Sequence, residues 1–406
     1  MENKKLLYIS YYFEYNSNPN GIQSERLLSE LKNYYDITVV YRTRTKHSKQ
    51  TLNDFSASKD FDLFPVYSKD LSIWDRRINR YIISICDFLS LDIIIWCFTF
   101  LMKFRRRDHN IIMISSNPFT VQIIGLLLKI RHKYTYISQF FDPLVDNYFS
   151  KLSRIALLIR KQYEYLIIKK SDFVFANNTM QYDRYIERYG RKLADKIHII
   201  PFCTDVTLLD KINSNYRREI NKNGKTILTH AGNLYGERNL DLLIVALNLL
   251  KKREVNLSDK LSVELIGGYE YKEFIKVKTN NLENVISFIP SLPFSEIYKY
   301  LQTSDGLILI DPDIEANIYF PSKLCEYLIY NKIIFGIIPH KSACRETLIN
   351  TGNLIFHKED GEFLANSISK LMHNADFYHD KTNPDYWEFF HPKRISKIIL
   401  DLLENK

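Results

Sequence analysis

The chain has 406 residues, of which 46% are hydrophobic and 25% charged, and its net charge is +9. This length exceeds one hydrophobic core and predicts two domains, and 12 glycines and 12 prolines are too few for long disordered linkers. No zinc finger, RNA-binding aromatic signature or long basic run accompanies the positive charge, which argues against a nucleic-acid partner. Five cysteines without a CxxC pair argue against a disulfide framework or zinc site and fit a reducing cytosol. Because a strand pattern begins close to Met1, we expect no secretory signal.

The first half alternates short apolar runs with helical patterns. Strands are predicted at 6–10, 36–41, 111–116, 134–138, 173–176 and 196–201. Asn20 and Gly21 are placed in the loop at the carboxyl end of the first strand, where glycine lets a ligand approach the backbone. Asn117 and Asp142 follow later strands of the same series. No GxGxxG is present, so the dinucleotide fingerprint is absent.

Two segments of this half leave alternatives open. The apolar run 93–102, followed by Arg105, Arg106 and Arg107, is too short to span a bilayer. It is either an interfacial helix at an anionic membrane or a buried helix with cations at its C-terminus. An amphipathic helix is predicted at 151–170 with six basic residues and one acidic residue, Glu164, and its charges are either a docking face or merely solvated.

The second half repeats the alternation after a polar segment at 213–225. Strands are predicted at 226–233, 263–268, 285–289 and 306–310, and helices at 240–250 and 392–403. This order predicts two parallel-sheet α/β domains facing a cleft.

The stretch 319–328, after the strand 306–310, is the most informative of the chain. Pro321 suits the first turn of a helix, which would put Ser322 and free amides at a helix N-terminus, where anions are favoured. Glu326 falls one turn further in. Amides for phosphate and a carboxylate for sugar hydroxyls predict a nucleotide site, although an ordinary strand, loop and helix would have the same pattern.

Several motifs, in order, resemble the retaining, nucleotide-sugar-dependent glycosyltransferases of family 4, which have the GT-B fold. The chain looks most like bacterial members that build capsule, O-antigen or exopolysaccharide. The similar motifs are Gly21 with 26–31, Phe141-Asp142-Pro143, 199–205, 230–239 and 321–327. The resemblance implies an acceptor-binding domain at 1–205, a nucleotide-sugar-binding domain at 206–385, and a C-terminal helix at 386–406 that packs back on the first domain.

The resemblance also implies the site residues. The donor would be bound by Gly232, Asn233, Arg238, Tyr319, Phe320, Pro321, Ser322, Lys323 and Glu326, and the acceptor by Asn20, Gly21 and Asn117. Arg238 and Lys323 would stabilise the leaving diphosphate. Asp142 would orient the acceptor hydroxyl or remove its proton, unless it is a structural loop cap.

Three positions depart from the family pattern. The first of the family's paired glutamates falls on Ile318, so its carboxylate is absent, and Glu315 or Asn317 are the candidates to replace it. The basic residue that often follows the glycine of the diphosphate loop is Asn233. The histidine often found in the amino-terminal half has no clear counterpart.

The sequence therefore predicts a retaining, metal-independent glycosyltransferase without a cofactor, using a UDP- or GDP-linked sugar. Asp311 and Asp313 have the spacing of a DxD metal-binding motif, but Pro312 stiffens the loop and we expect no metal there. The acceptor is expected to be a lipid-linked saccharide, reached by a cytoplasmic protein at the inner face of the membrane. The alternatives are a sugar-nucleotide epimerase or hydrolase of the same fold, and a non-catalytic nucleotide-sugar-binding partner.

Overall fold

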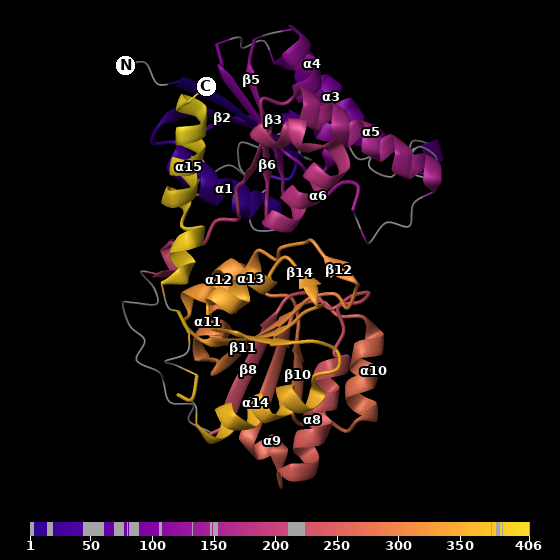
Figure 1. Ribbon diagram of the computed structural model, residues 1–406, viewed down its shortest axis with the longest axis vertical. Coiled ribbons are helices and arrows are strands. Elements are labelled where there is room, and N and C mark those ends of the chain that lie inside the picture. The colour runs from indigo at the N-terminus through magenta and orange to yellow at the C-terminus, as the bar shows by residue number, and fades with distance from the viewer. Residues whose placement is uncertain are drawn as a thin grey trace. The chain divides into compact units, whose positions relative to one another are not determined.

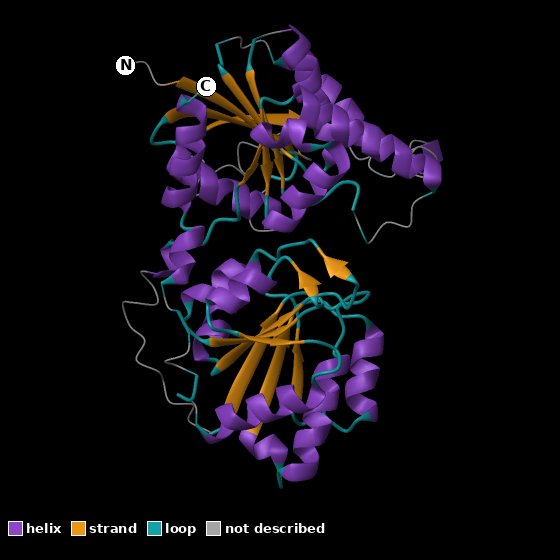
Figure 2. Cartoon of the chain, viewed as in Figure 1, coloured by secondary structure: helices purple, strands orange, loops and turns teal. Residues whose placement is uncertain are grey.

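The computed structural model describes residues 4–13, 19–43, 61–68, 77–78, 80, 89–104, 108–131, 133–146, 148, 153–209, 224–374, 376–378, 382–383 and 385–405. The chain forms two compact units, Met1–Cys203 with Pro392–Lys406, and Thr204–His391. Each unit is an α/β layer structure with helices on both faces of a parallel sheet (Figure 2). Four cysteines of the described part, Cys97, Cys203, Cys325 and Cys344, are buried free thiols, and Cys86 lies outside that part.

The first unit contains a seven-stranded parallel sheet in the order β3-β2-β1-β4-β5-β6-β7. Its strands are β1 (Lys4–Ile9), β2 (Tyr35–Thr43), β3 (Asp62–Tyr67), β4 (Ile111–Ser115), β5 (Thr135–Phe140), β6 (Phe173–Ala176) and β7 (Ile197–Ile199). The edge strand β3 was not predicted from the sequence, and it contains Pro65, a residue that sheets tolerate at an edge.

Helices cover both faces of this sheet (Figure 1). They are α1 (Pro19–Leu31), α3 (Leu91–Lys103), η3 (Phe119–Val121), α4 (Gln122–Arg131), α5 (Arg154–Lys170), α6 (Thr179–Tyr189), η4 (Arg191–Lys196) and α15 (Pro392–Glu404). Helix α15 packs beside α1, and Ile395 and Ile399 share one core cluster with Leu27, Leu28 and Leu31. The C-terminal helix therefore belongs to the first unit.

The second unit contains a six-stranded parallel sheet in the order β10-β9-β8-β11-β13-β15. Its strands are β8 (Thr226–Ala231), β9 (Leu261–Ile266), β10 (Ile286–Ile289), β11 (Gly306–Ile310), β13 (Ile333–Ile337) and β15 (Leu354–Phe356), with a small ladder of β12 (Ala316–Asn317) and β14 (Lys341–Ser342). Its helices are α8 (Asp241–Arg253), α9 (Leu257–Lys260), α10 (Tyr271–Thr279), α11 (Phe294–Thr303), α12 (Lys323–Ile329), α13 (Arg345–Asn350), α14 (Gly361–His373) and η6 (Tyr386–Phe390).

Two helix starts can be compared with the sequence prediction. Asn20 and Gly21 lie in the first turn of α1, because this helix begins at Pro19, and not in the loop expected for them. Helix α12 begins at Lys323, two residues after Pro321, and it has only seven residues. The residues 322–324 turn more tightly before it, since the amide of Leu324 donates to Pro321 O at 3.0 Å and that of Cys325 to Ser322 O at 3.1 Å.

No helix among the described residues is long and apolar enough to cross a membrane. The predicted run 93–102 forms most of α3, whose two sides differ. Ile93, Trp96, Cys97 and Phe100 are buried against the sheet, whereas Ile95, Phe98 and Met102 are exposed. The buried side confirms a helix packed in the core, whereas the interfacial interpretation stays a prediction. Arg105, Arg106 and Arg107 lie outside the described residues.

Candidate functional site

The carboxyl ends of the strands in the second unit form a common edge, where the loop after β8 lies against the loop after β9. The amide of Gly232 donates to Ile266 O at 2.8 Å, and that of Leu234 donates to Gly268 O at 2.8 Å. The Asn233 side chain accepts from the amide of Gly268 at 2.8 Å. These bonds hold the backbone of the 232–234 segment in place, so the side chains around it have a fixed frame.

Two nitrogen atoms converge on Gly232 from different elements. A Cβ atom at position 232 would lie 2.5 Å from Lys323 Nζ and 3.4 Å from His230 Nε2. Gly232 also has a φ of 155°. Lys323 is the first residue of α12 and His230 lies near the end of β8, so the glycine is required where the helix and the strand bring their nitrogens together.

The protonation of these groups follows from their surroundings. Desolvation and the neighbouring Arg238 guanidinium lower the pKa of Lys323 to about 7. Burial and the Lys323 ammonium hold the pKa of His230 well below its usual range, so the imidazole is neutral. His230 Nδ1 lies 3.0 Å from Ile308 O and must carry the proton that it donates there. Nε2 is then an acceptor, and it has no hydrogen-bond partner within the described residues.

Arg238 adds a second cation to this group. Its Nη1 donates to the Tyr235 hydroxyl at 3.1 Å, and its guanidinium lies over the Tyr235 ring, 5.3 Å from the ring centre. The Nε atom is buried, and no described residue accepts a hydrogen bond from it. The Arg238 guanidinium lowers the pKa of Lys323 and does not satisfy it, because like charges in a desolvated site repel. The arrangement can therefore accept an anion in addition to the nearby Asp311 carboxylate.

Asp311 is the buried carboxylate next to these cations. Its Oδ2 accepts from Asn317 Nδ2 at 2.7 Å and from Ser342 Oγ at 2.9 Å, and Cys344 Sγ lies 3.6 Å away. Burial raises the pKa of Asp311, while Asn317 and Arg238 oppose that rise. The carboxylate thus joins the loop after β11 to the loop after β13. It also counters part of the positive charge of Lys323.

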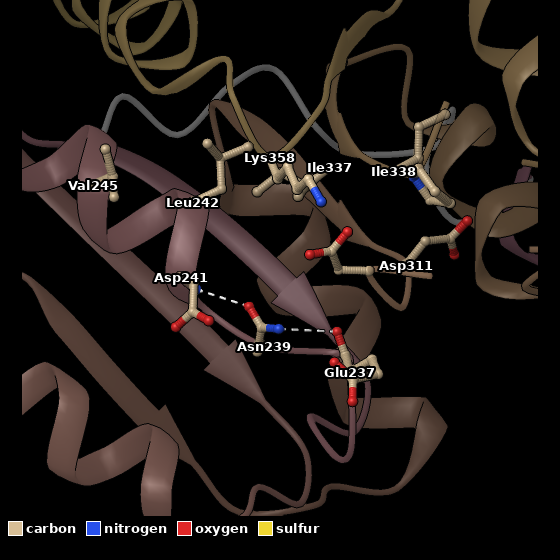
Figure 3. A pocket seen from close by; sticks show the side chains of 11 residues that line it. Glu237, Asn239, Asp241, Leu242, Val245, Asp311, Ile337, Ile338 and Lys358 are labelled. Carbon is tan, nitrogen blue, oxygen red and sulfur yellow. Dashed lines mark hydrogen bonds between the residues drawn. The ribbon is translucent and has the colours of Figure 1, made fainter. Parts of the chain in front are cut away.

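A small pocket of about 110 Å³ lies on another side of Asp311 (Figure 3). Four carboxylates line it, those of Glu237, Asp241, Asp311 and Asp313, together with the ammonium of Lys358. Its rim is fixed by Asn239, which donates to Glu237 O at 3.1 Å and accepts from the Asp241 amide at 3.0 Å. Such an acidic lining disfavours a diphosphate, so this pocket is a poorer candidate for an anion site than the surroundings of Lys323 and Arg238.

The remaining residues predicted to bind the donor occupy different surroundings. The amide of Tyr319 donates to Asn317 Oδ1 at 3.2 Å, and Phe320 is buried against Phe390 with ring centres 5.7 Å apart. Ser322 is the N-cap residue of α12, so the predicted position of Ser322 at a helix N-terminus is confirmed, and Lys323 follows it as the first residue of the helix. Glu326 lies in α12 and is 5% exposed.

Of the two candidates to replace the missing glutamate, Asn317 is fully buried and already bonded to Asp311. Glu315 is exposed, and Ile318 is buried in the core. Asn317 is therefore a structural residue of the loop, and Glu315 is the one of the two that a ligand could reach.

In the first unit, the structure brings together two of the predicted residues, Asn117 and Asp142. Asn117 has a φ of 80° and donates from Nδ2 to Asp142 Oδ2 at 2.5 Å. Asn20 lies in α1, where its carbonyl accepts from the Ser24 hydroxyl at 2.7 Å. The loop position predicted for Asn20 and Gly21 is therefore wrong, and the neighbouring Gly21 is buried in the helix.

Three groups of the site were not singled out from the sequence. They are the His230 imidazole, the Asp311 carboxylate as a link between loops, and the Tyr327 hydroxyl, which accepts from the Ala231 amide at 2.8 Å. His230 and Asp311 were visible as polar residues at the ends of buried strands, which is a usable signal. The Tyr327 contact joins residues 96 positions apart and has no local signal.

Comparisons with known proteins give a family match and structures of similar fold. Residues 213–383 match the family model of glycosyl transferases group 1, which covers less than half of the chain. A mannosylfructose-phosphate synthase of Agrobacterium fabrum is 27% identical over 244 residues, 55% of this chain. The match spans about half, 53%, of that relative's own length.

Two solved structures share the fold over the whole chain. Sucrose-phosphate synthase from Thermosynechococcus elongatus has a TM-score of 0.71 at 13% identity, with 99% of both chains covered. Anabaena HepE, solved with UDP and glucose, has a TM-score of 0.69 at 13% identity, with 100% of both chains covered. The GT-B fold expected from the sequence is therefore confirmed, and the matched family supports a sugar transfer.

Proposed function

We propose that this protein is a glycosyltransferase that moves a sugar from a nucleotide-sugar donor, held by the second unit, to a hydroxyl of an acceptor held by the first. The observation that carries the proposal is the group of Lys323, Arg238 and His230 around Gly232. The Lys323 ammonium and the Arg238 guanidinium, whose Nε has no hydrogen-bond partner among the described residues, fit a nucleoside diphosphate beside the neutral His230 imidazole. The family match over residues 213–383 supports the same assignment.

The chemistry follows from where charge develops. The bond between the anomeric carbon and a diphosphate oxygen breaks, and its electron pair goes to that oxygen. Lys323 and Arg238 stabilise the negative charge that builds there, and they do so more strongly than in water because the site is partly desolvated. The acceptor oxygen forms the new bond and loses its proton, for which the Asp142 carboxylate is the candidate base.

The finer assignments are also proposals. We propose transfer with retention, without a metal, from a UDP- or GDP-linked sugar to a lipid-linked saccharide at the inner face of a bacterial membrane, in surface polysaccharide synthesis. The motif resemblance supports this reading, and the HepE structure, solved with UDP and glucose, supports a uridine donor. Glu326 is proposed to accept hydrogen bonds from the ribose hydroxyls.

One experiment separates the proposal from its rivals. A panel of nucleotide sugars is screened for thermal stabilisation, because a ligand at 100 times its dissociation constant adds about 2.7 kcal/mol to stability. The stabilising donor is then incubated with EDTA, with and without saccharide acceptors. Nucleoside diphosphate release that requires an acceptor is the expected result. Consumption or epimerisation of the donor alone, or stabilisation without any turnover, overturns the transferase assignment.

A further inference from the structure

Three helices of the first unit, α3, α4 and α5, cover the same face of its sheet. Helix α4 contacts both α3 and α5, and Figure 1 shows the three beside one another. Their inner sides belong to the core clusters beneath, which include Trp96, Ile124 and Ile167. The outer sides of these three helices are exposed and are called here the outer helical face.

Large apolar side chains lie on the outer helical face. Ile95, Phe98 and Met102 of α3 are 48%, 54% and 80% exposed, and their spacing places them on one side of that helix. Ile130 at the end of α4, and Ile155 and Leu158 in the first turns of α5, are also more than half exposed. Single exposed apolar residues are ordinary, but a gathering over three adjacent helices is typical of an interaction surface.

The charges on these helices are almost all of one sign. The exposed cations are Lys103, Arg131, Lys133, Arg154, Lys161, Lys169 and Lys170, and within the described residues none of them forms an ion pair. The acidic residues of the helices do not offset them. Asp92 is half-buried and bonded to the Ser90 hydroxyl, and Glu164 is fully buried with Arg188 Nη1 at 3.0 Å. The outer helical face therefore carries large apolar side chains together with cations that its acidic residues do not offset.

We infer that the outer helical face docks on an anionic lipid bilayer, with Phe98, Met102 and Leu158 entering the interface and the cations lying at the headgroups. Apolar side chains on one side of a helix, with lysines and arginines beside them, have the chemistry of an interfacial helix. Clustered cations are drawn to anionic leaflets. A protein partner would need an apolar surface with carboxylates placed to match these cations. An anionic bilayer offers anionic headgroups and an apolar interior to the protein in any rotation about the membrane normal. The inference rests on the proposed function only in that such a surface would bring the enzyme to a lipid-linked acceptor.

The test is flotation with vesicles of phosphatidylethanolamine and phosphatidylglycerol, compared with vesicles of phosphatidylcholine. The parent protein is expected to float with the anionic vesicles at about 0.05 M salt, and to be released at about 0.5 M salt because screening shortens the reach of the charges. The triple variant Phe98→Glu, Met102→Glu, Leu158→Glu is expected to bind at least tenfold more weakly. The matched control carries the same charge change at exposed residues of the second unit, Val255→Glu, Tyr271→Glu and Ile349→Glu, and should float like the parent.

Several outcomes overturn the inference. They are no binding to the anionic vesicles, equal binding to the neutral ones, or equal loss in the control variant. Self-association that the triple variant abolishes, without vesicle binding, assigns the face to a second copy of the chain instead. The single variant Met102→Glu keeps the test usable if the triple variant does not fold. Calorimetry with UDP and GDP on the same proteins separates the two proposals, since a failed flotation with intact nucleotide binding leaves the proposed function in place.

Discussion

The carboxyl edges of the two sheets are built from the same topology but carry different polar groups. Within the described part of the second unit, the buried atoms without a hydrogen-bond partner include His230 Nε2, Arg238 Nε and Asp311 Oδ1 near the carboxyl edge, as well as the uncharged Gln302 Nε2 and Tyr330 hydroxyl elsewhere in the unit. In the loops after β1, β4 and β5 of the first unit, the acidic group Asp142 is bonded to Asn117, and the unpartnered buried atoms include the neutral hydroxyls of Ser10 and Tyr11.

This difference indicates two kinds of ligand. Burying charged groups without a partner is unfavourable. A sheet edge with such groups therefore suits an ionic ligand, whose binding offsets the cost of desolvating them. Neutral hydroxyls suit a ligand that itself carries hydroxyls, such as a saccharide. The predictions below test this contrast and run from the largest to the smallest expected effect on nucleotide affinity.

Lys323→Met is expected to lower the affinity for a nucleoside diphosphate about 10- to 150-fold, the value of one charge-assisted hydrogen bond of about 1.5–3 kcal/mol. Because no described residue bonds the Lys323 ammonium, the free energy of unfolding should not fall. Calorimetry and urea unfolding measure the two quantities. The control is Lys276→Met, whose ammonium pairs with Asp241 at 2.6 Å and Glu273 at 3.0 Å. Lys276→Met should leave nucleotide affinity unchanged and lower the free energy of unfolding. If instead Lys276→Met weakens nucleotide binding and Lys323→Met only destabilises the protein, the proposed difference between the two edges is wrong.

The pH dependence of nucleotide binding is the next largest effect. With a pKa of about 7 in the free protein, Lys323 loses its charge as the pH rises through 7, so affinity should fall by about tenfold between pH 7 and pH 9. The free energy of unfolding should instead rise over the same pH range. The pKa of Lys323 is lower in the folded than in the unfolded protein, so the unfolded chain binds more protons in this range and the free energy of unfolding rises with pH. Calorimetry in buffers of different ionisation enthalpy should detect proton uptake on binding above pH 7, and a flat profile in the parent protein argues against the assignment.

Sequence reasoning located this second edge better than the first. The strand 306–310 has the same bounds in the structure, and Gly232, Arg238 and Lys323 do lie at one edge of the sheet, because strand ends and loop residues are local features. The helix start expected near Pro321 is also close to the observed one, since Ser322 is the N-cap of α12 and Lys323 its first residue. By contrast, the loop position expected for Gly21 was wrong, because α1 already begins at Pro19, before its apolar period becomes visible.

Contacts between distant residues account for what the sequence could not predict. The pKa of Lys323 depends on Arg238 and Asp311, and Asp311 itself depends on Ser342, 31 positions away. The two sides of α3 could not be distinguished either, because the run 93–102 is apolar all round and only the sheet decides which side is covered.

Asp311→Asn should weaken nucleotide affinity moderately, since removing the carboxylate lowers the pKa of Lys323 further and leaves less ammonium at neutral pH. Stability should also fall by about 1–3 kcal/mol, because a buried amide cannot accept from both Asn317 and Ser342 without placing its own donors in the core. Thermal unfolding and calorimetry measure both. Asp313→Asn, at an exposed position two residues along the same loop, is the matched control and should change neither. Equal stability of the two variants would show that Asp311 does not hold the loops together.

Asp142→Asn tests the other edge and should leave nucleotide affinity within about twofold of the parent value. The replacement keeps an oxygen that accepts from Asn117, so the loop conformation is expected to survive. Acceptor-dependent turnover should nevertheless fall by about 100-fold, because an amide cannot take the proton of the acceptor hydroxyl. Single-turnover release of the nucleoside diphosphate at saturating donor and acceptor measures this step. If turnover is unchanged while Asp142→Ala destabilises the protein, Asp142 is a loop cap, and the acceptor hydroxyl must lose its proton to another group of the first unit.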